Sequence, residues 1–277
     1  MRVACLQTEP KPTIEEALSE AISLAIEAEE RRADFIFLPE YCGGLKSDGA
    51  LYCPPAEKEE NHIFLSEFKR FCKEKSIWCC LGSIAIDNGD EKIINRGFII
   101  DDQGIVVSRY DKIHLFDITL KDEEHKESDT VEPGNKAVIL ETKFGVIGHT
   151  ICYDLRFPSL YRNLAKNGAQ ILLAPAAFTR KTGAAHWHIL NQCRAIENGA
   201  FVISPCAIGD IDGGGGSYGH SLIIDPWGKV IADGGGERGV IVGDINIELV
   251  NEVRTQLPSL RHDRNFEVSK VLASEQK

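Results

Sequence analysis

The sequence has no excess of basic residues. Its 277 residues include 31 lysines and arginines against 42 aspartates and glutamates, which gives a formal net charge of −11 at pH 7. A nucleic-acid partner needs a basic face to neutralise its phosphates, so this balance argues against one. It does not exclude an anionic small substrate, because an acidic protein can hold a local basic pocket.

Long apolar runs are also missing. No run approaches the length of a membrane span, and the first ten residues, MRVACLQTEP, have no apolar stretch followed by a small-residue cleavage site. We therefore expect a cytoplasmic protein with no membrane partner. None of the nine cysteines forms a C-x-x-C pair, the spacing typical of zinc and thioredoxin-type sites. We accordingly expect reduced thiols, no metal and no cofactor.

Short apolar runs alternate with helical stretches instead. Hydrophobic residues make up 43% of the chain and charged residues 26%, which is ordinary for a globular protein with a sizeable core. Thr-Ile-Glu-Glu at 13–16 is a capping box, which predicts the start of a long helix. The first part of the chain is predicted to hold strands at 2–7, 34–40 and 78–86 and helices at 13–33 and 57–75.

The rest of the chain continues the alternation. A hairpin is predicted at 95–101 and 104–110, followed by a polar loop over 119–134. Further strands are predicted at 138–141, 145–151, 171–176, 201–208 and 219–225, with helices at 158–167 and 186–198. This order predicts sheets covered by helices, and we see no linker that would divide the chain. We expect a single domain over 1–277 with a C-terminal tail from about residue 265.

A short motif occurs twice. Ile-Ile-Asp-x-x-Gly is found at 99–104 and again at 223–228, each time between apolar runs. One interpretation is two unrelated hairpins with the same turn chemistry. The other is a pseudo-symmetric fold of two similar sheets.

Three residues stand at the ends of predicted strands. Cys152 follows a β-rich run and precedes a helix, Glu40 closes an apolar strand, and Lys112 closes the second strand of the hairpin. Taken singly, Cys152 fits a buried core thiol, and each charge fits a solvated surface position. Together they supply what amide hydrolysis by a thiol needs: a nucleophile, a base and a cation that stabilises the oxyanion.

The segments around these residues resemble a known family. Phe-Leu-Pro-Glu at 37–40, Tyr-Asp-Lys-Ile-His-Leu-Phe at 110–116 and Ile-Cys-Tyr-Asp-Leu-Arg-Phe-Pro at 151–158 are similar to the three catalytic motifs of the nitrilase, or carbon–nitrogen hydrolase, superfamily. Segments at 175–178, 183–187, 194–197 and 218–221 also resemble it. The likeness runs from about residue 2 to 264, nearest to the branch of omega-amidases and deaminated-glutathione amidases.

This resemblance implies roles and a fold. Glu40 would be the general base, Lys112 the oxyanion-stabilising cation and Cys152 the nucleophile, with the Tyr153 backbone N–H as a second donor. Glu127 is the candidate for a further glutamate of the family, although His125 stands where the family has an aromatic residue. The implied fold is an α/β protein, an α-β-β-α sandwich of two mixed sheets. The family usually forms homodimers by packing helices, so a homodimer or higher even oligomer is expected.

Substrate-binding candidates follow from the same segments. Phe178 and His186 lie in the resembling stretches, and Arg156 and Arg180 are cations near the active segments. Arginine suits a carboxylate because its planar fork donates two parallel hydrogen bonds. The alternative is that Arg156 pairs with Asp154 or Glu197 and that Arg180 is solvated. The preferred substrate is expected to be a small linear amide that carries a distant carboxylate.

Other patterns have weaker interpretations. Gly-Gly-Ser-Tyr-Gly at 215–219 fits G-x-S-x-G, but a glycine loop precedes it and a strand follows, so a serine nucleophile is disfavoured. His186 and His188 would lie on different faces of a helix, which favours packing and pocket lining over metal binding. Two alternatives to amide hydrolysis stay open: nitrile hydrolysis by the same three residues, and a non-catalytic binding or redox-sensing role for Cys152.

Overall fold

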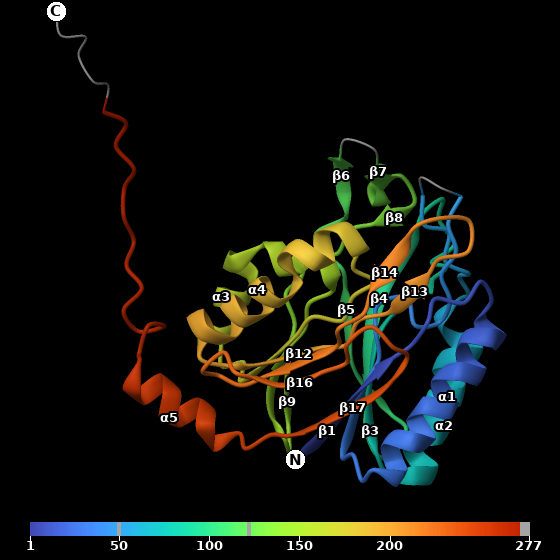
Figure 1. The fold of residues 1–277 in the computed structure, drawn as a ribbon, viewed down its shortest axis with the longest axis horizontal. Helices are drawn as coiled ribbons and strands as arrows, with labels where there is room; N and C mark the ends of the chain where they lie inside the picture. The colour runs from blue at the N-terminus through green and yellow to red at the C-terminus, as the bar shows by residue number, and fades with distance from the viewer. Residues whose placement is uncertain (49–50, 121–122, 272–277) are drawn as a thin grey trace, which may run out of the picture.

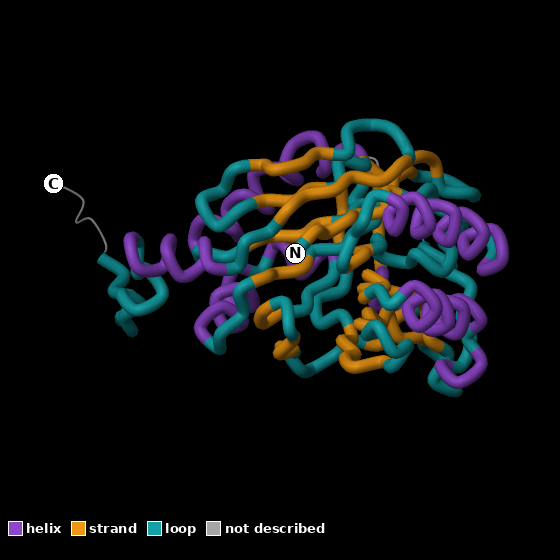
Figure 2. Tube along the Cα trace, turned by 90° about the horizontal axis from the view of Figure 1, so that it is seen from below, coloured by secondary structure: helices purple, strands orange, loops and turns teal. Residues whose placement is uncertain are grey.

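A computed structural model describes residues 1–48, 51–120 and 123–271. They form two mixed β-sheets that lie face to face, with helices on the outer side of each (Figure 1). The view from below shows the strands enclosed between the helices (Figure 2). No helix within these ranges is long and apolar enough to cross a membrane. The expected α-β-β-α sandwich is confirmed.

The first sheet has the strand order β17-β1-β2-β3-β4-β5, with β8 paired to β4. Its strands are β1 (Arg2–Gln7), β2 (Phe35–Phe37), β3 (Trp78–Ile86), β4 (Ile93–Ile100), β5 (Val106–Asp111), β8 (Val131–Glu132) and β17 (Gly239–Asp244).

The second sheet has the order β16-β15-β12-β11-β10-β9. Its strands are β9 (Ile139–Thr142), β10 (Gly145–Gly148), β11 (Ile171–Leu173), β12 (Phe201–Ser204), β15 (Leu222–Ile224) and β16 (Val230–Asp233). Two small two-stranded sheets stand apart: β6 (Asp117–Leu120) with β7 (Glu123–Lys126), and β13 (Ile208–Asp210) with β14 (Gly216–Tyr218).

The two large sheets repeat one pairing pattern. The series β17-β1-β2-β3-β4-β5 and β9-β10-β11-β12-β15-β16 each run antiparallel, parallel, parallel, antiparallel, antiparallel. The repeated Ile-Ile-Asp-x-x-Gly motif lies at the turn between β4 and β5 and again between β15 and β16. The two copies therefore occupy equivalent positions, which supports the pseudo-symmetric interpretation.

Four helices cover the sandwich. α1 (Ile14–Glu30) and α2 (Ile63–Lys75) pack on the first sheet, whereas α3 (Pro158–Lys166) and α4 (Arg180–Asn198) pack on the second. The predicted cap is present, since the Thr13 hydroxyl accepts the Glu16 N–H at 3.3 Å. α5 (Glu248–Gln256) follows β17, and the remaining short helices are η1 (Glu59–Asn61), η2 (Glu127–Asp129) and η3 (Cys152–Arg156).

The core has three layers because side chains alternate along each strand. In β1, Ala4 and Leu6 face the layer beneath α1 and α2. Val3 and Cys5 face the opposite way, into the layer between the sheets, where the second sheet contributes Ile171 and Ile203 among others. A third layer lies between the second sheet and α3 and α4. Each strand that is buried on both faces therefore appears as a continuous apolar run.

Several expected boundaries are wrong. The predicted strand at 34–40 has only three residues in a ladder, and the predicted helix at 57–75 divides into η1 and α2. The polar loop at 119–134 is partly ordered as β7, η2 and β8, while residues 121–122 of that segment lie outside the described residues. α4 begins at Arg180 rather than at His186, because Gly183 is accommodated inside the helix against the ring of Tyr218.

The C-terminal tail extends away from the sandwich (Figure 1). Its described part ends at Val271, and the last six residues of the expected tail, 272–277, lie outside the described residues. This tail exposes the large apolar side chains of Phe266, Val268 and Val271 to solvent.

Gly82 lets the ends of two strands approach each other. A Cβ atom at this position of β3 would lie 2.2 Å from the Leu38 carbonyl oxygen, 2.4 Å from that of Pro39 and 2.5 Å from the Pro175 Cβ. Two of these atoms belong to backbone that has no room to move aside. Only glycine therefore fits between these segments.

We expect Gly82→Ala to lower the free energy of unfolding by about 1–3 kcal/mol, the usual cost of overpacking a well-packed core. Denaturant titration followed by circular dichroism measures the change. The matched control is Gly236→Ala, where an added Cβ meets no atom within 4 Å. Equal stability of the two variants would show that the strand ends are not held as closely as described.

Candidate active site

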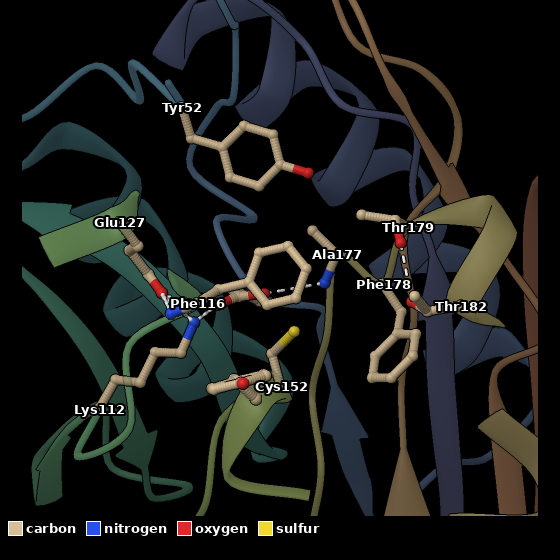
Figure 3. A pocket seen from close by; sticks show the side chains of 11 residues that line it. Tyr52, Lys112, Phe116, Glu127, Cys152, Ala177, Phe178, Thr179 and Thr182 are labelled. Atoms are coloured by element: carbon tan, nitrogen blue, oxygen red, sulfur yellow. Dashed lines mark hydrogen bonds and ion pairs between the residues drawn. The ribbon is translucent and has the colours of Figure 1, made fainter. Parts of the chain in front are cut away.

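Three strand ends meet at one pocket. Glu40 lies three residues after β2, Lys112 directly follows β5, and Cys152 begins η3 after β10. All three side chains are buried, and Figure 3 shows the Cys152 sulfur and the Lys112 ammonium directed toward the same space. The pocket is lined by Glu40, Tyr52, Lys112, Phe116, Glu127, Cys152, Tyr153, Ala177, Phe178, Thr179 and Thr182.

Lys112 joins two buried carboxylates. Its Nζ lies 2.8 Å from Glu40 Oε1 and 2.7 Å from Glu127 Oε2. Burial by itself would lower the pKa of Lys112, but the charges of Glu127 and Glu40 together raise that pKa well above its ordinary value. Lys112 therefore stays an ammonium although only 2% of it is exposed. Because the ammonium stands between the carboxylates, they do not form an open metal site.

The Glu40 carboxylate is fixed at both oxygens. Oε1 accepts hydrogen bonds from Lys112 Nζ and from Asn95 Nδ2 at 3.0 Å, and Oε2 accepts the Ala177 backbone N–H at 3.0 Å. Asn95 comes from β4 and also donates to Glu127 Oε1 at 3.2 Å. These donors hold the carboxylate in one orientation beside Cys152.

Glu127 is fixed from a different part of the chain. It begins η2, and its Oε2 accepts the Phe116 backbone N–H at 2.6 Å. Its Oε1 accepts the Tyr41 hydroxyl at 3.0 Å. The hairpin of β6 and β7 separates Phe116 from Glu127, so the hydrogen bond between them closes the base of that hairpin.

Cys152 has a left-handed backbone conformation, with φ of 46°. This region is unfavourable for residues other than glycine, and such strain is often found at functional sites. The backbone N–H of Cys152 donates to the Pro175 carbonyl at 2.8 Å. Burial, and next the charge of Glu40, raise the pKa of the Cys152 thiol well above its ordinary value, and Lys112 offsets part of that effect. The resting sulfur is therefore a protonated thiol that needs a base.

Asp154 joins the segment of Lys112 to the segment of Cys152. It is fully buried, and its Oδ2 accepts the Tyr110 hydroxyl at 2.6 Å and the Ile151 backbone N–H at 2.9 Å. Its Oδ1 accepts the His114 backbone N–H at 3.1 Å and lies 2.7 Å from His114 Nδ1. Asp154 therefore fixes the turn that presents Cys152.

Aromatic rings form the walls of the pocket. Phe116 and Tyr153 meet edge to face, with ring centroids 5.2 Å apart. The His125 ring packs on the Phe116 ring and on the Tyr52 ring, with centroids 5.0 and 5.6 Å apart. An imidazole therefore completes the wall at the position where the nitrilase superfamily has an aromatic residue. Opposite them, the hydroxyls of Thr179 and Thr182 lie 2.8 Å apart (Figure 3). The pocket is thus narrow, mostly apolar and charged on one side only.

The candidates named from the sequence divide into two groups. Glu40, Lys112, Cys152, Glu127, Tyr153 and Phe178 all line the pocket. Arg156, Arg180 and His186 do not. Arg156 lies at the rim, with its guanidinium 5.2 Å from the centroid of the Phe178 ring and its Nη1 3.3 Å from His186 Nδ1. It pairs with neither Asp154 nor Glu197.

Arg180 forms an ion pair with a residue that does not line the pocket. Its Nη2 lies 2.7 Å from Asp210 Oδ1, and the side chain is about half exposed. The sequence did not reveal this pairing, because Arg180 and Asp210 come from separate elements, α4 and β13. It also did not reveal Asn95 or Tyr41. Asn95 could have been noticed, because it is a polar amide within the apolar run that forms β4.

Comparison with known proteins finds relatives that match most of the chain. The family model described as carbon–nitrogen hydrolase matches residues 2–255. Deaminated glutathione amidase of Dictyostelium discoideum is 38% identical over 250 residues, covering 86% of this chain and 84% of that protein. Omega-amidase NIT2 of Xenopus tropicalis is 33% identical over 265 residues, covering 95% of each. The crystal structure of Saccharomyces cerevisiae Nit3, a member of branch 10 of the nitrilase superfamily, superposes with a TM-score of 0.81 at 28% identity, covering 93% of this chain and 94% of that one.

The pKa of Cys152 gives a test of the site that does not require a substrate. We expect Glu40→Gln to lower the thiol pKa, because it removes a neighbouring negative charge. The pH profile of alkylation by iodoacetamide, followed by mass spectrometry of the Cys152 peptide, should shift toward lower pH. Wild-type protein treated in parallel is the reference. Glu252→Gln, at an exposed position of α5, is the control variant, and a shift of equal size in that control would refute the assignment.

Proposed function

Because the chain belongs to the carbon–nitrogen hydrolase family of the nitrilase superfamily, we propose that it hydrolyses a small linear amide through a thioester on Cys152. The observation that carries this proposal is the meeting of a thiol, a carboxylate and an ammonium around one buried pocket. These are the groups that acyl transfer to a thiol needs.

In the proposed reaction, Glu40 takes the thiol proton of Cys152 while the sulfur attacks the amide carbon. Lys112 and the Tyr153 backbone N–H stabilise the oxyanion of the tetrahedral intermediate. The intermediate collapses with cleavage of the C–N bond, and the protonated Glu40 gives its proton to the leaving ammonia or amine. Glu40 then takes a proton from water, which attacks the thioester, and the sulfur leaves with that proton as the acid is released. Glu127 keeps Lys112 charged and in place throughout.

The burial of the Cys152 thiol argues against a redox-sensing role for this residue. A redox-sensing cysteine is typically exposed and has a lowered pKa, because the thiolate is the species that is oxidised. Cys152 is 7% exposed and its pKa is raised. Its environment therefore favours activation by Glu40 within a closed pocket over a sensor. Nitrile hydrolysis uses the same attack, so it is tested by offering an amide and the corresponding nitrile and comparing ammonia release.

We expect Cys152→Ala to abolish ammonia release, with a loss of at least about a thousandfold, as for removal of other catalytic nucleophiles. Glu40→Gln should slow both acylation and deacylation, because each step transfers a proton. Rapid-quench mass spectrometry of the wild type during turnover should show an acyl adduct on Cys152. Glu252→Gln, at an exposed position of α5, is the control variant and should turn over normally. Turnover without any adduct would argue against a thioester.

We propose that the substrate carries a carboxylate remote from its amide. The relatives are named deaminated glutathione amidase and omega-amidase, and both names imply acidic amides. Arg156 is the cation at the rim of the pocket, held over the Tyr153 and Phe178 rings at 5.9 and 5.2 Å from their centroids. Within the described residues Arg156 contacts His186 and pairs with no carboxylate, which leaves the guanidinium available to an anion. Arg180 is already paired with Asp210, so we assign the carboxylate to Arg156.

The comparison that tests this assignment uses an omega-amide of a dicarboxylic keto acid and its neutral methyl ester. We expect the wild type to prefer the acid in kcat/KM, and Arg156→Met to lose about tenfold to a hundredfold on the acid alone, since a hydrogen bond to a charged group is worth about 1.5–3 kcal/mol. Arg180→Met is the matched control. Equal rates on acid and ester in the wild type would exclude an anionic substrate, and a preference that survives Arg156→Met would exclude this residue.

We also propose that two copies associate through α4. Ile189 and Ile196 are 64% and 48% exposed, with exposed Cys193 between them, and their spacing places them on one side of the helix. Trp227, 60% exposed, adds to this surface, because Gly228 beside it packs against Ile196. Such an apolar stripe on a helix is typical of an interface between subunits.

Light scattering at micromolar concentration should give twice the mass of the chain. Ile189→Glu should shift the protein toward the monomer, because it would bury a charge in the interface. Ile105→Glu, at another exposed isoleucine in the turn before β5, is the matched control. A wild-type monomer under these conditions would refute the dimer.

We propose that this protein works in the cytoplasm. The reaction needs Cys152 as a thiol, and all nine cysteines are free thiols in the fold. A reducing compartment keeps them so.

A further inference from the structure

A second cluster of reactive side chains lies outside the pocket. His188 of α4, His220 before β15 and Asp233 at the end of β16 meet at one place, with one donor atom from each within 4.8 Å of the others. His188 Nε2 lies 3.0 Å from Asp233 Oδ2, and His220 Nδ1 lies 2.9 Å from Asp233 Oδ1. None of the three residues lines the pocket that holds Cys152.

The backbone around this cluster is firmly held. His220 has a φ of 53°, its N–H donates to the Gly235 carbonyl at 2.8 Å, and its carbonyl accepts the Trp187 indole N–H at 2.7 Å. The Gly235 N–H in turn donates to Asp233 Oδ1 at 2.9 Å. The ring of Tyr218 stacks on His220, with centroids 4.7 Å apart. The backbone bonds fix the position of His220, and the stacked Tyr218 ring and the bond to Asp233 orient its imidazole.

The spacing and the donor types suit a metal. Ligands 2.0–2.1 Å from a tetrahedral Zn²⁺ lie roughly 3.3 Å from one another. Each imidazole nitrogen lies close to a different oxygen of the Asp233 carboxylate, and one ligand atom from each residue lies within 4.8 Å of the others. Rotation of these side chains would bring one nitrogen of each ring and one carboxylate oxygen to the spacing that a single ion needs. The side chains of His188, His220 and Asp233 are 33%, 29% and 35% exposed, so water can reach the remaining coordination position.

We propose that His188, His220 and Asp233 bind a divalent transition-metal ion of the Zn²⁺ class, with water completing the coordination. Two imidazoles and one carboxylate are a ligand set that such ions prefer. On binding, the metal takes the lone pairs of His188 Nε2 and His220 Nδ1, and any proton shared with the carboxylate is released to solvent. The sequence pair His186 and His188 does not form the site; His188 has its partners from β16 and the loop before β15.

Calorimetric titration with ZnCl₂ tests this on the full chain carrying Cys152→Ser and Cys193→Ser, which removes the pocket thiol and the exposed thiol as competing ligands. We expect one ion per chain. Asp233→Asn, His188→Gln and His220→Asn should each weaken binding by at least about tenfold, since even residues that only orient metal ligands change affinity by about 10–100-fold. Asparagine is chosen at 220 because it tolerates the left-handed conformation.

Asp210→Asn and His262→Gln, both at exposed positions, are the controls and should bind as the parent does. His188→Gln lies on a helix and leaves the Asp233 turn intact, so it distinguishes loss of a ligand from loss of structure. Co²⁺ in place of Zn²⁺ should give visible ligand-field absorption without a thiolate charge-transfer band. Absence of Zn²⁺ binding by the parent, or unchanged affinity in the ligand variants, would overturn the proposal and leave a hydrogen-bonded cluster.

Discussion

The buried ammonium of Lys112 between Glu40 and Glu127 is the interaction on which the site depends. Moving a charge out of water costs several kcal/mol per ion, and removing one partner of a buried pair leaves the other uncompensated. Here the cluster holds two negative charges against one positive charge, so the remaining lone pairs need other donors. They come from Asn95, Ala177, Phe116 and Tyr41, which belong to four separate parts of the chain. The charges of the site therefore depend on the packing of the sandwich, which brings these four donors together.

The twofold pattern of the sheets explains how those parts meet. Each sheet has a parallel centre, and the segments that carry Glu40 and Cys152 leave such parallel strands, β2 and β10. Pro175 follows β11 and accepts the Cys152 N–H, and Gly82 lets the Leu38–Pro39 backbone approach Pro175. Asp154 then connects the turn at Cys152 to Tyr110 and His114, which lie on either side of Lys112 in the chain. The nucleophile is thus held at the meeting of the two sheets, and its strained φ is supported from both.

Much of the fold was predictable because its signals are local. The cap at Thr13 defined the start of α1, and the apolar run at 78–86 coincided with β3. The repeated Ile-Ile-Asp-x-x-Gly motif left two interpretations open, one of which was two similar sheets. Errors occurred where tertiary contacts overrode local preference. Residues 38–40 leave the β2 ladder, and α4 extends through Gly183 because the Tyr218 ring packs there. β7 reads Glu-Glu-His-Lys and is wholly polar, so its sequence gave no apolar alternation to recognise.

The sequence by itself determined the family, the sandwich and the three chemical groups, since motif order and residue type are properties of the linear chain. Only the tertiary structure decided how those groups are charged and which neighbours they have. The raised pKa of Cys152 comes from burial and from Glu40, which lies more than a hundred residues away in the chain. The same holds for Arg156 at the rim, for Arg180 paired with Asp210, and for His188 beside His220 and Asp233. Electrostatic energy depends on distance in space and on exclusion of water, and neither can be read from spacing along the chain.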